Sequence, residues 1–303
     1  MRKVIVGTRG SKLALTQTKG VIKQLSQHHP ELEFEIKVIQ TKGDMFQDVA
    51  LEKIGDKGLF VKEIEQQLLS EEIDLAIHSM KDMPSTSPAG LIFTKAPKRE
   101  DSRDVLVLKG AFKALADLPM GATIGTGSKR RKFQLLTLRP DLNVVPIRGN
   151  VDTRLAKIET ENLDGTILAA AGLHRLDYHN KITEYLSKDD FIPAPAQGAL
   201  ALQIRESDQW LAERLQALAH VPTQLEIEAE RGFLAGINGT CHEPIGAKAT
   251  IVGETLTLTG LYGDAEGHLV MDQVVGLVAD GYKLGFGLGV KLRKMVQEHS
   301  EKR

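Results

Sequence analysis

Arginine side chains gather where predicted strands give way to helices. A guanidinium group binds a carboxylate through two parallel hydrogen bonds, and in open α/β sheets the strand-to-helix loops form the ligand crevice. Hydroxyl donors at helix starts would add to such a site, because a helix N-terminus favours anions. The arginines in these places are Arg9, Arg130, Arg131, Arg148, Arg154 and Arg175, and the hydroxyl residues are Ser11, Thr126 and Ser128. Together they favour a site for a polyanion, although any one of these arginines would also suit a solvated surface.

Two motifs that the sequence lacks narrow the choice of anion. Phosphate remains an alternative to carboxylate, but neither a G-x-x-x-x-G-K-[ST] loop nor a G-x-G-x-x-G fingerprint occurs. These motifs hold nucleotide phosphates with backbone N–H groups. A nucleotide is therefore a poor candidate for the ligand.

The segment His78 to Pro84 places a charged pair at the end of a predicted strand. It follows the apolar run Ile73 to Ile77, and its proline closes the turn. Lys81 and Asp82 should therefore face the ligand crevice. A Lys-Asp pair in an exposed turn is the plainer alternative.

A second basic segment surrounds Lys53 and Lys57. Gly55 and Gly58 interrupt it, so the backbone is free to move. This composition suits a mobile loop over the site and equally suits a flexible entry to a helix.

Cys241 is the only cysteine, which excludes an intramolecular disulfide. It lies in a Gly- and Pro-bounded loop, residues 238–245, and a loop exposes a thiol more than a core does. No Cys/His cluster has zinc-site spacing, so no metal site is expected. The residues alone leave open whether Cys241 is buried filler, a nucleophile assisted by His242 or another reacting group.

Composition indicates an ordinary globular protein. The 303 residues include 39 basic and 40 acidic ones, so the net charge of −1 attracts neither nucleic acid nor anionic membranes. The first residues pass straight into a strand-like run without a long apolar stretch, so no signal peptide or membrane span is expected. We expect a cytoplasmic protein without nucleic-acid or membrane partners.

Alternating short β-branched runs and helical patterns predict two α/β domains of similar size, because this rhythm is typical of parallel α/β units. The polar or Pro/Gly-rich stretches 95–101 and 192–198 fit paired crossings between them. Both series contain a strand that runs into Gly-Thr and then Ser, a hint of related halves. We expect domain 1 over residues 1–96 with 197–218 returning to it, domain 2 over 97–196, and a smaller α+β domain 3 over 219–303 with the cysteine loop.

An ordered set of segments over most of the chain resembles the porphobilinogen deaminase family. The resembling segments are 7–11, 41–44, 57–63, 78–84, 99–101, 125–131, 139–142, 147–155, 169–173, 230–234 and the loop with Gly239, Cys241 and Pro244. The resemblance implies two domains like those of type II periplasmic binding proteins, plus a smaller C-terminal domain that bears the cysteine. It also implies a monomeric transferase.

The resemblance implies a reaction and a cofactor. Enzymes of this family condense four porphobilinogen molecules head to tail into hydroxymethylbilane with loss of ammonia, in tetrapyrrole (haem) biosynthesis. They use a dipyrromethane cofactor, joined by a thioether to a loop cysteine that matches Cys241. Each pyrrole carries acetate and propionate groups, which arginines suit through bidentate pairing.

Residue roles follow from the same resemblance. Asp82 matches the catalytic aspartate, and Lys53 and Lys57 match a mobile loop. The family positions that bind carboxylates of the cofactor or substrate correspond to Arg9, Ser11, Lys81, Thr126, Ser128, Arg130, Arg131, Arg148, Arg154 and Arg175. Gln197 corresponds to a family position between the domains.

Two residues depart from the family pattern. Thr240 stands where a second glycine is usual before the cysteine, which restricts the backbone there. Gly127 stands where a serine is common, which removes a hydroxyl donor but leaves a backbone N–H for an anion. Neither change removes a reacting group.

Two rival hypotheses belong to other classes. A binding protein or the effector module of a regulator would use the same anion crevice, but it would need neither the cysteine loop nor the Lys81-Asp82 pair. A cysteine-nucleophile hydrolase would need a reactive thiol at Cys241, whereas the deaminase hypothesis predicts a blocked one.

Overall fold

The computed structural model describes residues 2–41, 43, 61–239 and 243–301. Lys53, Lys57 and Cys241, three of the predicted functional residues, lie outside these ranges. The chain forms two compact units. Unit 1 comprises Met1–Glu100 and Gly198–Gln224, and unit 2 comprises Asp101–Gln197 and Leu225–Arg303.

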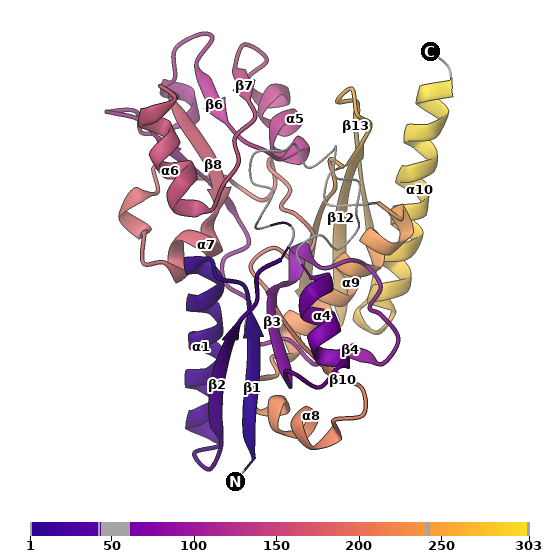
Figure 1. Cartoon of the computed structure of the whole chain (residues 1–303). Helices are drawn as coiled ribbons and strands as arrows, with labels where there is room; N and C mark the ends of the chain where they lie inside the picture. Colours follow the sequence, from indigo (N-terminus) through magenta and orange to yellow (C-terminus); the bar gives the residue numbers. More distant parts are fainter. Residues whose placement is uncertain (1, 42, 44–60, 240–242, 302–303) are drawn as a thin grey trace. The chain divides into compact units, whose positions relative to one another are not determined.

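Unit 1 is built on a five-stranded sheet of order β2-β1-β3-β10-β4 (Figure 1). β1 runs parallel to β2 and β3, whereas β10 runs antiparallel to β3 and β4. The strands are β1 (Lys3–Thr8), β2 (Glu33–Val38), β3 (Leu75–Ser79), β4 (Leu91–Phe93) and β10 (Leu200–Arg205). The helices are α1 (Lys12–His28), α4 (Lys62–Leu69) and α8 (Gln209–Leu215), with short 3-10 turns at Met80–Asp82 and Gln216–Leu218.

Apolar side chains pack against both faces of this mixed sheet, because helices cover each face. On one face Val21 and Leu25 of α1 pack with Val6 and Ile77. On the other face Ile64 and Leu68 of α4 pack with Ile39 and Ile73. The helices thereby hold the carboxyl ends of β1 and β3 in place, and predicted site residues lie there.

Unit 2 contains a second five-stranded sheet, of order β7-β6-β8-β5-β9. β6 is parallel to β7 and β8, and β5 is antiparallel to β8 and β9. The strands are β5 (Asp104–Leu108), β6 (Thr123–Gly125), β7 (Asn143–Val145), β8 (Gly165–Ala169) and β9 (Glu184–Tyr185). The helices beside them are α5 (Lys129–Leu138), α6 (Val151–Thr160) and α7 (Ala170–Arg175), with 3-10 turns at Leu115–Asp117 and His179–Lys181.

The two sheets share one design, which supports the hint of related halves. In each, three parallel strands are completed by an antiparallel strand beside the third. Details repeat as well. Asp74 accepts a hydrogen bond from the backbone N–H of Ile5 at 2.9 Å, and Asp164 accepts one from Thr123 at 2.7 Å. Each of these aspartates precedes the third parallel strand and ties it to the first.

The expectation of parallel α/β units is wrong for β5. This strand is antiparallel, and a 3-10 turn follows it where a longer helical stretch was expected. A parallel strand needs a helical crossover, and between β5 and β6 the structure has only the 3-10 turn Leu115–Asp117. The mixed α/β class itself is confirmed.

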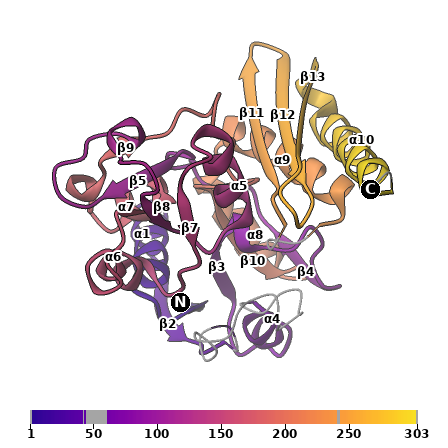
Figure 2. The ribbon, with the colours of Figure 1, turned by 90° about the horizontal axis from the view of Figure 1, so that it is seen from above.

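The C-terminal part of unit 2 is a three-stranded antiparallel sheet covered by two helices on one face (Figure 2). The strands are β11 (Gly246–Val252), β12 (Thr255–Gly263) and β13 (Leu269–Leu277), a 3-10 turn spans Val278–Asp280, and the helices are α9 (Val221–Ile237) and α10 (Gly281–Glu301). Glycines let the helices approach closely. A Cβ on Gly285 would lie 2.1 Å from the carbonyl oxygen of Ala229, and one on Gly289 would lie 2.4 Å from that of Phe233. Any side chain there would force α9 and α10 apart.

Candidate functional site

In unit 1 the predicted residues lie at the carboxyl ends of β1 and β3. Arg9 follows β1, and Ser11 caps α1 by accepting a hydrogen bond from the backbone N–H of Ala14 at 3.2 Å. Lys81 and Asp82 form the 3-10 turn after β3, and the Asp82 side chain is exposed. Because both strands end at the same sheet edge, Arg9, Ser11 and Asp82 come together there, and Lys81 lies beside them in the chain without lining the cavity described below.

A cavity of about 90 Å³ lies at this edge of unit 1. One cation, two hydroxyls and one carboxylate line it together with apolar groups. Its lining includes Arg9, Ser11, Gln17, His78, Ser79 and Asp82. The structure thus places Arg9, Ser11 and Asp82 around one cavity, as the motif positions predict.

His78 is a lining residue that the motif analysis left without a role. Burial lowers the pKa of His78 to about 4; a hydrogen bond with Gln203 opposes this effect and the charge of Arg9 adds to it. The amide nitrogen of Gln203 donates to Glu65 at 2.9 Å. Within the described residues Nε2 of His78 has no hydrogen-bond partner. The imidazole is therefore neutral at neutral pH and presents no additional cation to the cavity.

Acid should destabilise the fold through His78. The pKa of His78 is 6.5 in the unfolded chain and about 4 in the folded chain. At a pH between these two values the unfolded chain binds a proton at His78 and the folded chain does not. The free energy of unfolding should therefore fall by about 2 kcal/mol through this group between about pH 7 and about pH 5. Urea unfolding of wild type and His78→Asn at both pH values measures the difference. The exposed His28→Asn serves as the control and should keep the wild-type loss; an equal loss in His78→Asn would contradict the prediction.

In unit 2 the loop after β6 orients the first turn of α5. The hydroxyl oxygen of Thr126 accepts a hydrogen bond from the backbone N–H of Ser128 at 3.2 Å. Ser128 in turn caps α5 by accepting from the N–H of Arg131 at 3.4 Å. Ser128 and Ser11 thus perform the same capping role at equivalent places in the two units. The cap directs Arg130 and Arg131 toward the carboxyl edge of the sheet.

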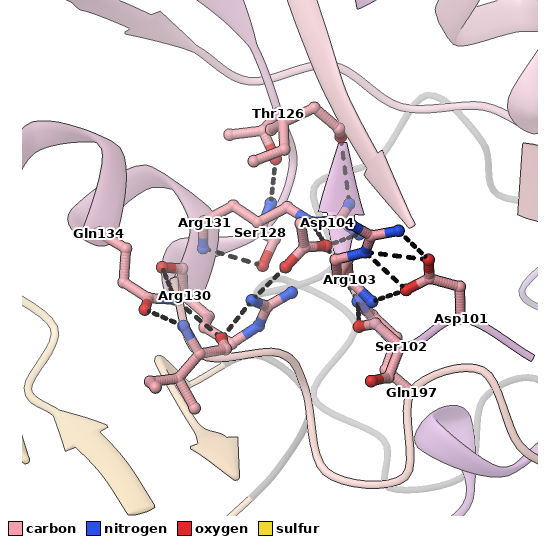
Figure 3. A network of polar contacts seen from close by, with 12 residues as sticks. Asp101, Ser102, Arg103, Asp104, Thr126, Ser128, Arg130, Arg131, Gln134 and Gln197 are labelled. Carbon is pink, nitrogen blue, oxygen red and sulfur yellow. Dashed lines mark hydrogen bonds and ion pairs between the residues drawn. The ribbon is translucent and has the colours of Figure 1, made fainter. Parts of the chain in front are cut away.

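Arg130 and Arg131 converge on one buried carboxylate, that of Asp104 (Figure 3). Nη1 of Arg130 donates to Oδ2 of Asp104 at 2.6 Å and to the carbonyl oxygen of Ile192 at 2.7 Å. Nε and Nη2 of Arg131 lie 2.9 and 2.7 Å from Oδ1. The exposed fractions are 4% for Arg130, 6% for Arg131 and 0% for Asp104. The solvated-surface alternative is therefore wrong for both arginines.

The charges of this cluster do not balance. Burial lowers the pKa of Arg130 and Asp104 raises it, while the neighbouring Arg131 lowers it again. Among the residues that the structure describes, two guanidinium groups share one carboxylate, which leaves one excess positive charge in a desolvated place. A further anion would offset that charge, since an unpaired buried charge is costly.

Gln197 joins the same cluster. Its amide nitrogen donates to the carbonyl oxygen of Ser102 at 2.8 Å and to Oδ1 of Asp104 at 3.1 Å. Gln134 holds the preceding segment, since its amide accepts from the N–H of Ile192 at 2.7 Å and donates to the carbonyl of Ile192 at 3.0 Å. Gln197 is fully buried and acts within unit 2 as a support of Asp104.

The remaining arginines follow the strands of the unit 2 sheet along the chain. Arg148 follows β7, Arg154 lies in the first turn of α6, and Arg175 ends α7 after β8. All three are half-buried, and Nε of Arg154 donates to the carbonyl oxygen of Gly149 at 2.8 Å. Arg148 directly follows its strand, as expected, whereas the placement of Arg154 and Arg175 toward a ligand and the ligands of all three arginines stay predictions.

Comparisons with known proteins decide the family. The model "Porphobilinogen deaminase, dipyromethane cofactor binding domain" matches residues 4–213, and the model of the C-terminal domain of that enzyme matches residues 224–295. The chain belongs to the porphobilinogen deaminase family. The porphobilinogen deaminase of Clostridioides difficile is 55% identical over 98% of both chains. That of Clostridium novyi is 52% identical over 94% of this chain and 97% of its own length.

Solved structures with a similar arrangement are less closely related. A periplasmic binding protein of Salmonella typhimurium with high arginine specificity is 17% identical, with a TM-score of 0.41 over 72% of this chain and 92% of its own. A probable amino-acid ABC transporter extracellular-binding protein of Bacillus subtilis is 14% identical, with a TM-score of 0.44 over 72% and 90%.

Family membership confirms several expectations from the sequence. The chain is a member of a transferase family and carries that family's dipyrromethane cofactor binding domain. The expected α/β class, with two mixed five-stranded sheets and a smaller C-terminal α+β part, is confirmed. The rival hypotheses of a binding module and a cysteine hydrolase are set aside. Within the described residues no helix has both the length and the apolar character needed to cross a bilayer.

Sequence reasoning missed two residues, Asp104 and His78. Asp104 begins an otherwise apolar run, 104–108, so an acidic residue at the entry of a buried strand was a usable signal. His78 stands in the His78 to Pro84 segment directly after the apolar run Ile73 to Ile77. Its position on a strand buried along its length was the signal that its ring would be desolvated.

Proposed function

We propose that the chain joins four porphobilinogen molecules head to tail into hydroxymethylbilane with release of ammonia, in tetrapyrrole (haem) biosynthesis. The observation that carries this proposal is the buried Arg130–Arg131 pair with its single carboxylate, in a chain of the porphobilinogen deaminase family. A carboxylate-rich oligopyrrole supplies the anion that this excess charge requires.

The described residues fit a dipyrromethane cofactor. Arg130 and Arg131 would hold its carboxylates through charge-assisted hydrogen bonds, and Thr126 and Ser128 prepare the helix end beside them. Cys241, outside the described residues, would form the thioether. When bound, the cofactor would supply the primer on which pyrroles are joined.

Asp82 would be the catalytic group. As the carbon–nitrogen bond of the substrate's aminomethyl group breaks, ammonia leaves and positive charge develops on the pyrrole. An ionised carboxylate near the pyrrole N–H stabilises that charge. A carbon–carbon bond then forms at a free ring carbon of the primer, and Asp82 helps remove the proton from this carbon. Exposure of Asp82 beside the cavity of unit 1 supports this role.

The other predicted residues would hold carboxylates of the substrate and the growing chain. In unit 1 these are Arg9, Ser11 and Lys81, and in unit 2 they are Arg148, Arg154 and Arg175. Gln197 would contribute through Asp104. We also propose that the protein acts as a monomer in the cytoplasm, and that the domain boundaries 1–96 with 197–218, 97–196 and 219–303 hold.

The intact mass and the products of turnover test this function. Purified protein should exceed its sequence mass by two linked pyrroles, because the primer stays attached to the enzyme. Incubation with porphobilinogen should release one ammonia for each porphobilinogen consumed. A protein that consumes no porphobilinogen would refute the activity, and an unmodified chain with full turnover would refute the covalent primer.

A further inference from the structure

Asp104 lies at the edge of its sheet where the parallel strands end, because β5 is antiparallel to the strands on either side of it. In the register of β5 and β8, Asp104 is opposite Ala169, the last residue of β8. The first residue of an antiparallel strand thus reaches the edge at which the parallel strands end. The matching strand of unit 1, β10, begins with Leu200 opposite Ser79. The acidic residue at this position is therefore particular to unit 2.

The two oxygens of Asp104 are divided between the two guanidinium groups. Oδ2 accepts from Arg130, and Oδ1 accepts from Arg131 and Gln197. Nη1 of Arg130 is engaged by Asp104 and by the carbonyl of Ile192. No hydrogen bond from Nε or Nη2 of Arg130 is found within the described residues. One edge of this guanidinium is thus held by the protein, and the other can receive an outside carboxylate.

The contact with Asp104 fixes the orientation of the guanidinium groups as well as offsetting part of their charge. A flexible arginine must lose side-chain freedom when it binds an anion, and prior anchoring removes much of that cost. The planar fork of a guanidinium, held at one edge, presents its remaining donors in a defined plane. Figure 3 shows the carboxylate of Asp104 between Arg130 and Arg131, with Gln197 beside it.

We propose that Asp104 is a positioning residue: its carboxylate orients Arg130 and Arg131 so that they capture carboxylates of the dipyrromethane cofactor. The proposal rests on the proposed function. It predicts that loss of the negative charge impairs cofactor loading even where the arginines remain. Asp104 itself would touch neither cofactor nor substrate.

Cofactor loading of Asp104→Asn, measured by intact mass, tests the proposal. We expect the rate at which the cofactor is loaded to fall at least about tenfold from the wild-type value, the change that about 1.4 kcal/mol of lost positioning would cause. Asp141→Asn is the matched control, because Asp141 forms an ion pair with Arg139 at 2.7 Å in the same unit. It should load normally. Wild-type loading in Asp104→Asn would overturn the proposal.

A double variant separates positioning from general loss of structure. Asp104→Asn combined with Arg130→Gln removes one buried anion together with one buried cation, so it should melt close to wild type even if Asp104→Asn alone unfolds. If Asp104 acts through Arg130, the double variant should load no worse than Arg130→Gln alone. If the loading defects of Asp104→Asn and Arg130→Gln instead multiply in the double variant, the two residues act independently and the proposal is overturned. If wild-type protein carries no added pyrroles, the proposed function fails instead.

Discussion

Protein with Cys241→Ala should be isolated without added pyrrole mass and without measurable turnover. A thioether requires the sulfur atom, and Cys241 is the only cysteine in the chain, so no other side chain can replace it. The arginine pair at Asp104 would still bind carboxylates, but a primer held only by ion pairs would leave with the product. Intact mass and porphobilinogen consumption measure the two effects.

Thiol titration provides the control for this variant. In active wild-type protein Cys241 should not react with a thiol reagent, because its sulfur is already bonded. The variant should have the same melting temperature as cofactor-free wild-type protein, since it lacks only the sulfur atom. Wild-type protein that is fully active with a titratable thiol would contradict the attachment at Cys241.

Asp82→Asn should lower turnover by at least about two orders of magnitude, the range expected for positioned acid–base catalysis and a preorganised charge contact. Asparagine keeps the size and one oxygen but loses the negative charge that would stabilise the developing cation. The fold should tolerate the change, because the Asp82 side chain is exposed and ends a short turn after β3. Turnover, thermal melting and cofactor mass should be measured together, with only turnover affected.

Asp280→Asn is a matched control for this prediction. Asp280 also ends a 3-10 turn, Val278–Asp280, and its side chain is 50% exposed. Its substitution removes the same charge from a similar local structure but should leave turnover unchanged. Asp82→Glu restores the charge at a different reach and should recover only part of the rate. Wild-type turnover in Asp82→Asn would remove Asp82 from the mechanism, and a collapsed melting temperature would make its role structural.

Local sequence was enough to locate much of the fold and one part of the site. Ser11 and Ser128 stand before helical runs, and both cap the helices that follow. Capping depends on residues three apart, so spacing alone reveals it. Asp82 follows an apolar strand, and it lies at the carboxyl end of β3. The family motifs, which are also read along the chain, led to the family itself.

The tertiary structure alone decided the rest, because the contacts concerned are distant in sequence. Residues 104 and 130 are 26 positions apart and residues 104 and 197 are 93 apart, yet these side chains meet at one carboxylate. Their meeting depends on β5 running antiparallel, a direction that no local hydrophobic pattern specifies. The burial of Arg130 and Arg131 could not be predicted from the sequence for the same reason. Arginine is almost always exposed unless paired, and the sequence does not reveal that Asp104 is the partner.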